Sequence, residues 1–216
     1  MSVTHPVDRH IRRLTTPRAA AFAGVLFAVL FGAALVLIRT AHAEAEHQLR
    51  AAVVLMPFAG IAFLWFLGVV RDGLGVFEDR FFATVFLGSG LMFLGMIFAS
   101  TAVGAGIIAV RASGGPHTEV VTFGQALLVS LSNTYALRMA AVFMISLATI
   151  WLRTRLMPAW LVVVTYAVAL CVLVGSDLSP WATIAFPVWV LVVSVLLLVR
   201  ASGGDLVWGR VRDLPD

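Results

Sequence analysis

The chain has 216 residues, of which 61% are hydrophobic and 12% are charged. A water-soluble domain keeps about a quarter of its residues charged, so this composition excludes an ordinary soluble domain and indicates a protein embedded in lipid. The net charge is +4, and all 15 basic residues are arginines scattered near the ends of apolar segments. That pattern excludes a concentrated basic surface for nucleic acid.

Apolar stretches of about 20 residues, the length that crosses a bilayer, predict six transmembrane helices. Their approximate bounds are 19–38, 51–70, 82–110, 124–152, 157–175 and 181–199. The connectors between them are too short to hold a soluble domain. The predicted fold is therefore all-α, a six-helix transmembrane bundle over residues 19–200, with an N-terminal segment 1–18 and a C-terminal tail 201–216.

The arginines predict the orientation of the bundle. Eleven lie in the N-terminal segment, the second and fourth loops and the stretch from Arg200 to the C-terminus, and three lie in the other loops. Because basic residues favour the cytoplasmic side, both termini are expected in the cytoplasm. The use of arginine without lysine favours a GC-rich bacterial genome, so the predicted location is the cytoplasmic membrane of a bacterium.

The end of the first span offers an Ala-x-Ala pattern in RTAHA, residues 39–43, as a cleaved signal peptide would. However, the apolar stretch is longer than a usual signal sequence, and Arg39 stands where a small neutral residue is preferred. We expect an uncleaved anchor, with cleavage as the alternative.

Small residues recur every four positions in the first span, at Ala20, Gly24, Ala28 and Gly32. This spacing lets another backbone approach closely. We favour a contact with a helix of the same chain, and the alternative is a seam for a second copy or a protein partner.

The first outer loop holds the densest group of potential metal ligands, in HAEAEH at residues 42–47. His42 and Glu46 would share a face of a helix, and His117 in the next outer loop could add a third ligand. A solvated turn without metal is the favoured interpretation.

The fourth apolar run contains the one charge predicted inside the membrane, Arg138. Counting about 20 residues back from Trp151 puts the outer boundary near Asn133. Arg138 would then lie about 8 Å below that boundary, a depth that a snorkelling arginine can nearly bridge.

In a regular α-helix, Thr134 and Tyr135 would share the face of Arg138, and Ser146 and Thr149 would follow on roughly the same face. Such a polar stripe is expected to face the bundle interior or another protein, with Asn133 rotated away.

Arg138 is expected to have an acceptor, and Asp177 beyond the fifth span is the favoured one. The candidate polar site is therefore Asn133, Thr134, Tyr135, Arg138 and Asp177. The favoured role of Arg138 is to fix helix packing, and the alternative is to bind or gate a solute.

No catalytic or cofactor motif emerges from the sequence. The five histidines lie outside the predicted spans, so no axial pair for haem is available, and no P-loop or His-Glu-x-x-His occurs. Cys171 is the lone cysteine in an apolar run, which favours a buried structural thiol. We expect a protein that is not an enzyme and has no cofactor.

Two short strings recur, VRASGG at 110–115 and 199–204 and LMP at 55–57 and 156–158. Two three-span halves of opposite topology would form an inverted repeat of the kind found in transporters. The spacing differs between the two pairs, so chance similarity is the favoured interpretation.

The segment NTYALRMAAVFMISLATIWLRTRLMPAWLVVVTYAVAL and the later FPVWVLVVS resemble a family of uncharacterised bacterial multi-pass membrane proteins. The resemblance is carried by Asn133, Tyr135, Arg138, Arg153, Pro158, Pro187 and Trp189. It implies a six-helix bundle and no particular chemistry.

Three functional classes stay open. The favoured one is a non-enzymatic accessory or sensory membrane component that acts through partners. The alternative is a transporter or channel for a small, anionic solute with Arg138 in the pathway. A metal-dependent membrane enzyme is the third.

Overall fold

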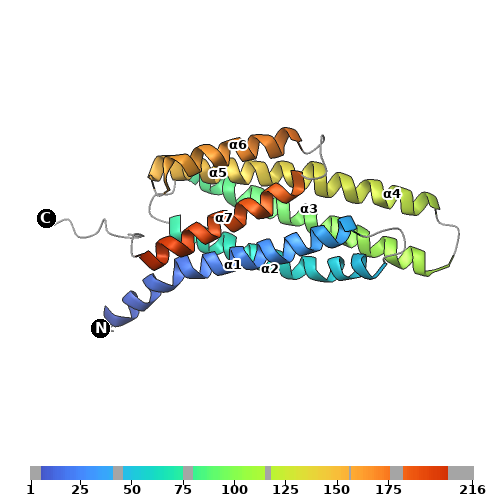
Figure 1. Ribbon diagram of the computed structural model, residues 1–216, viewed down its shortest axis with the longest axis horizontal. Helices are drawn as coiled ribbons and strands as arrows, with labels where there is room; N and C mark the ends of the chain where they lie inside the picture. Colours follow the sequence, from blue (N-terminus) through green and yellow to red (C-terminus); the bar gives the residue numbers. More distant parts are fainter. Residues whose placement is uncertain are drawn as a thin grey trace.

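The computed structural model shows a bundle of long helices that run along one common axis (Figure 1). It describes residues 6–40, 46–74, 80–114, 118–155, 157–175 and 182–203. Within these ranges every regular element is helical, which confirms the all-α prediction. The start of α1 and the end of α7 lie at the same end of the bundle (Figure 1).

The described residues form six rods, each of which contains most or all of one predicted span. The elements are α1 Pro6–Thr40, α2 Glu46–Leu74, α3 Arg80–Ala112, α4 Thr118–Val129, η1 Ser130–Ala136, α5 Leu137–Thr154, α6 Ala159–Gly175 and α7 Ala182–Gly203. The elements α4, η1 and α5 join end to end into one rod of 37 residues.

Five of these rods hold an apolar stretch long enough to cross a bilayer, and the sixth, α6, has 17 apolar-rich residues. Seventeen residues is the lower end of the length that spans a hydrocarbon core. The chain is therefore a polytopic membrane protein. The candidate tail from residue 204 onward lies outside the described residues.

The rods pack as two groups that meet in an aromatic core. Helix α1 packs against α2 and α7, whereas α5 packs against α3 and α6. Phe63 of α2 lies at the centre, with its ring centroid 4.9 Å from that of Phe27, 5.3 Å from Phe93 and 5.6 Å from Phe143. Phe186 of α7 completes the cluster, 4.8 Å from Phe93.

This aromatic cluster matters because lipid removes the usual hydrophobic drive for helices to associate. Close packing and edge-to-face ring geometry then have to supply the specificity. Phe63, Phe93 and Phe186 meet mostly edge to face, with interplanar angles of 60° to 65°. The rings thus fix how five of the helices sit on one another.

The small residues of α1 are used partly inside the chain. Ala20 and Ala28 are buried, and a Cβ added to Gly24 would clash with Ser194 of α7 and Phe66 of α2. Gly32, in contrast, has no atom within 4 Å of such a Cβ. The close approach of α1 to α7 therefore depends on the absence of a side chain at Gly24.

Helix α5 ends in a tight turn. Arg155 has φ of 52°, a left-handed conformation that closes the helix at Thr154. Pro158 follows, and because proline lacks an N–H it favours the start of a new helix at Ala159. This short turn folds α6 back along α5.

A candidate ligand cavity beside a π-helical segment

The rod formed by α4, η1 and α5 is not the uniform α-helix that the sequence predicts. Seven residues, Ser130–Ala136, form a π-helical segment between α4 and α5. A π-helix widens the turn so that carbonyl i pairs with the N–H of residue i+5 rather than i+4. Such segments are rare and occur often at functional sites.

Serine hydroxyl groups bond to the backbone where this segment begins. Ser132 Oγ donates a hydrogen bond of 2.8 Å to the Leu128 carbonyl oxygen, one helical turn earlier. Ser100 Oγ of α3 donates to the same oxygen at 3.1 Å. Hydroxyl groups of this kind satisfy backbone carbonyls where a membrane helix departs from regular geometry. The second bond also ties the irregular turn to α3.

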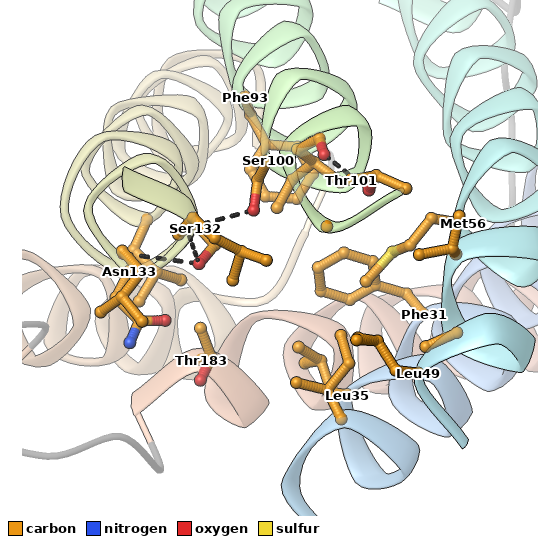
Figure 2. Close-up of a pocket in the computed structure, with 18 residues that line it drawn as sticks. Phe31, Leu35, Leu49, Met56, Phe93, Ser100, Thr101, Ser132, Asn133 and Thr183 are labelled. Carbon is orange, nitrogen blue, oxygen red and sulfur yellow. Dashed lines mark hydrogen bonds between the residues drawn. The ribbon is translucent and has the colours of Figure 1, made fainter. Parts of the chain in front are cut away.

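A cavity of about 170 Å³ lies against this segment (Figure 2). Its wall is built by side chains from α1, α2, α3, the end of α4, η1, the first residue of α5 and the start of α7. It lies in the half of the bundle away from the start of α1 and the end of α7. Cavities between the helices of a bundle are common places for small-molecule binding.

The two sides of the cavity differ in polarity. Helices α1 and α2 contribute only apolar side chains, among them Phe31, Leu35 and Met56. The polar side chains come from α3, η1 and α7, and they are Ser100, Thr101, Ser132, Asn133 and Thr183. Figure 2 shows Ser100 and Ser132 close together on one side, facing Phe31 and Met56 on the other.

Phe31 and Phe93 belong both to the cavity wall and to the aromatic core. Their ring centroids are 5.8 Å apart, and Phe93 lies 4.8 Å from Phe186. Phe186 in turn stacks on Trp189, which lies 6.3 Å from Trp151 near the end of α5. A contiguous line of rings thus runs from the cavity towards the opposite end of the bundle.

The sequence-predicted polar site is divided by the structure. Asn133 lines the cavity. Thr134 and Arg138 are partly buried and do not line the cavity. Because residues 130–136 are π-helical, α-helical spacing does not place these side chains relative to one another.

One end of the expected polar stripe lies on the surface of the chain. The Tyr135 side chain is 53% exposed and faces away from the bundle interior. Ser146 is buried as expected, and Thr149 Oγ1 lies 2.7 Å from Tyr166 Oη of α6. Asp177, the predicted acceptor for Arg138, lies outside the described residues.

Sequence reasoning missed four of the five polar side chains of the cavity. Ser100 and Thr101 are adjacent hydroxyl residues inside a long apolar run, and Ser132 directly precedes Asn133. Hydroxyl residues in a membrane helix often bond to their own backbone, so their presence alone gives no reason to group them. Only the packing of α3 against η1 brings them to one wall.

The metal interpretation gains no support from the described residues. His42 and His117 lie outside the described ranges, and Glu46 begins α2 with a side chain that is not described. Elsewhere in the described ranges, no three His, Cys, Asp or Glu side chains gather. Cys171 is exposed on α6, so the prediction of a buried thiol is wrong. The arrangement that is present can bind a molecule but offers no nucleophile paired with a base.

No protein-family model, curated protein or solved structure matches this chain. The resemblance to a family of uncharacterised bacterial membrane proteins is therefore not supported by a match. What holds is the coarser statement, a multi-pass helical membrane protein.

Proposed function

We propose that the chain is a non-enzymatic membrane component of accessory or sensory type, which recognises a small molecule in the cavity and acts through a protein partner. The observation that supports this best is the position of the cavity against η1. A π-helical turn can relax towards α-helix, so a ligand that contacts it can favour one of the two geometries.

The line of aromatic rings can transmit a change in the geometry of η1 from the cavity to the opposite end of the bundle. A shift of Phe93, or of Phe31 acting through Phe93, would disturb the packing of Phe186 and Trp189 behind them. Close-packed interiors transmit displacements because they contain little free volume. The far end of α5 and α7 is therefore the expected output surface.

A transporter with Arg138 in its pathway receives less support. The described residues that line the cavity include no charged side chain, and Arg138 is not among them. An anion in this cavity would meet no opposite charge from its wall, at a considerable desolvation cost.

We further propose that the protein lies in the cytoplasmic membrane of a bacterium with both termini inside. The support is the arginine distribution, with eleven on the side of the termini and three on the opposite side. The cavity would then lie in the outer half of the bilayer.

Thiol labelling in intact cells tests the choice between sensor and transporter. In a Cys171→Ser background, Arg138→Cys is exposed to a membrane-impermeant maleimide, with Ser113→Cys at the exposed turn after α3 as the positive control. We expect labelling at position 113 and none at 138. Fast labelling at 138 would show a water-filled path from outside and would replace the sensor proposal with the transporter.

Purification in a mild detergent tests the requirement for a partner. The wild-type chain is expected to retain a stoichiometric protein partner after cross-linking in cells. Ala52 lines the cavity, so the larger side chain of Ala52→Leu would occupy part of it and is expected to change how much partner is recovered. Phe123→Ala, on the exposed side of α4, is the control and is expected to leave that recovery unchanged. The proposal would be contradicted if the wild-type chain purified without a protein partner both with and without cross-linking.

A further inference from the structure

Three hydroxyl groups of the cavity wall, those of Ser100, Thr101 and Ser132, already donate their protons to backbone carbonyls. Ser132 and Ser100 donate to the Leu128 carbonyl at 2.8 and 3.1 Å, and Thr101 Oγ1 donates to the Ile97 carbonyl at 2.8 Å. A hydroxyl group has one proton and two acceptor lone pairs. Towards a guest, these three groups can therefore act only as acceptors, so the wall suits a molecule that donates a hydrogen bond.

The amide of Asn133 adds adaptability to the same wall. Its side chain carries N–H donors on one atom and an acceptor oxygen on another. It extends from η1 on the side of the cavity where Thr183 lies (Figure 2). A guest whose hydroxyl group donates to a serine could therefore accept from the Asn133 amide.

The other residues of the cavity wall limit the charge and the shape of the guest molecule. No charged side chain lines the cavity in the described ranges, and burying an ionised guest without a partner is costly. The opposite wall presents Phe31, Phe93 and Met56, whose rings and sulfur suit an apolar or aromatic body.

The volume indicates how much of a guest the cavity can hold. The volume of about 170 Å³ is close to that of an engineered apolar cavity of about 150 Å³ that holds one benzene molecule in another protein. A single substituted ring or a short branched chain fits this space.

We propose that the cavity is a binding site for a small uncharged molecule with an apolar body and one hydrogen-bond donor, that is, a phenol or an alcohol. This inference rests on the proposed function and specifies the chemical class that the sensor recognises. Phenols and alcohols partition into the interfacial region of a bilayer, so they reach a cavity between membrane helices.

The test compares two probes that differ by one group. Full-length protein in lipid nanodiscs is titrated with 4-fluorophenol and, separately, with 4-fluorotoluene, and binding is followed by fluorine NMR with empty nanodiscs subtracted. We expect saturable binding of 4-fluorophenol that phenol displaces, and at least tenfold weaker binding of 4-fluorotoluene. A site that hydrogen-bonds a hydroxyl group rejects the analogue that lacks it.

Two variants locate the site. Ser132→Ala removes an acceptor from the wall and is expected to weaken 4-fluorophenol binding by roughly three- to tenfold, the value of one hydrogen bond. Its matched control is Ser146→Ala, which loses the same type of bond, 2.8 Å to the carbonyl four residues earlier, outside the cavity lining. Ala52→Leu is expected to abolish binding, and circular dichroism checks that each variant is folded.

Three results would overturn the inference. Equal saturable binding of both probes would show that the cavity binds apolar molecules, lipid chains included, without selecting for a hydroxyl group. No saturable binding of either probe would remove the ligand class. Equal effects of Ser132→Ala and Ser146→Ala would place the site elsewhere. None of these alters the labelling result at position 138 or the partner result, so the proposed function fails or stands on its own measurements.

Discussion

Helices α4 and α5 belong to the same rod, yet their surroundings are opposite. Helix α5 buries ten of its 18 residues, including Phe143 and Trp151, whereas α4 buries none of its 12. Among the described elements α4 packs only on α3 and η1, while α5 packs on α3, α6, α7 and η1. In Figure 1 the α3–α4 pair extends beyond the ends of α6 and α7.

The comparison teaches that hydropathy does not reveal whether an apolar helix faces protein or lipid. Both helices are apolar enough to belong to one membrane span. What differs is the neighbouring structure, because lipid and protein are equally good solvents for an apolar side chain. The π-helical segment and the cavity lie where the rod passes from the exposed part to the buried part.

The largest expected effect comes from removing a ring of α5. Phe143 is fully buried against Phe63, Phe86 and Phe186, so Phe143→Ala leaves a cavity in the aromatic core. We expect a loss of about 2 to 5 kcal/mol in the free energy of unfolding, with the lower part favoured because lipid also solvates the ring. Equilibrium unfolding in mixed micelles measures it.

The matched variant for that experiment is Phe123→Ala in α4. The Phe123 side chain is 69% exposed, so the expected change is within about 0.5 kcal/mol. Similar losses for the two variants would mean that α4 is packed as tightly as α5, and the comparison would fail.

Two glycines of α3 allow its packing against α2 and α5 to be compared with its packing against α4. A Cβ at Gly90 would lie 3.1 Å from Leu67 Cδ1 and 3.2 Å from Phe143 Cδ2, both on fully packed side chains. Gly90→Ala is therefore expected to cost about 1 to 3 kcal/mol. At Gly104 the nearest atom is Leu128 Cδ1 of α4, at 3.3 Å, and this partly buried side chain can move.

Gly104→Ala is accordingly expected to be neutral or to stabilise by up to about 1 kcal/mol through better helix propensity. Thermal melting of both variants in the same detergent gives the comparison. A greater loss of thermal stability for Gly104→Ala than for Gly90→Ala would show that the packing of α3 against α4 is the more rigid.

A smaller effect is expected for the hydrogen bond between α5 and α6. Thr149 Oγ1 donates to the Ile145 carbonyl, so the 2.7 Å contact is made by the Tyr166 hydroxyl group donating to Thr149. Tyr166→Phe removes this bond with little change of shape. Bonds of this type between membrane helices contribute about 0.6 kcal/mol on average, and unfolding of Tyr166→Phe measured beside wild type checks that value.

A double variant sharpens that measurement. Thr149→Val combined with Tyr166→Phe should lose little more than either change alone, because both remove one interaction. Fully additive losses would mean that the two hydroxyl groups do not bond to each other in the membrane.

The smallest effect is expected at the end of α5. Arg155 holds a left-handed backbone conformation, which glycine adopts at less cost. Arg155→Gly is expected to raise stability by a few tenths of a kcal/mol, on the order of 0.3 kcal/mol. Arg155→Ala, which removes the charge and keeps the strain, should not stabilise, and an equal gain in both variants would assign the effect to the charge.

Much of the fold could be predicted from the apolar runs. Six apolar runs predict the six rods because an unbroken helix is the way for a single segment to satisfy its backbone in lipid. The cavity could not be predicted, since its polar wall depends on Ser100 meeting the Leu128 carbonyl, 28 residues away. Asn133 belongs to the predicted polar site, but its place in the cavity wall could not be predicted, because α-helical spacing does not hold across the π-helical segment.

The sequence by itself determined that this protein is helical and lies in a membrane, because hydrocarbon imposes length and apolarity on every segment that crosses it. The tertiary structure alone decided which apolar faces are buried, where the rod widens into a π-helical turn, and which hydroxyl groups meet at the cavity. These features arise from contacts between helices far apart in the chain. In lipid, such contacts depend on shape and hydrogen bonds, which the hydropathy of a single segment does not encode.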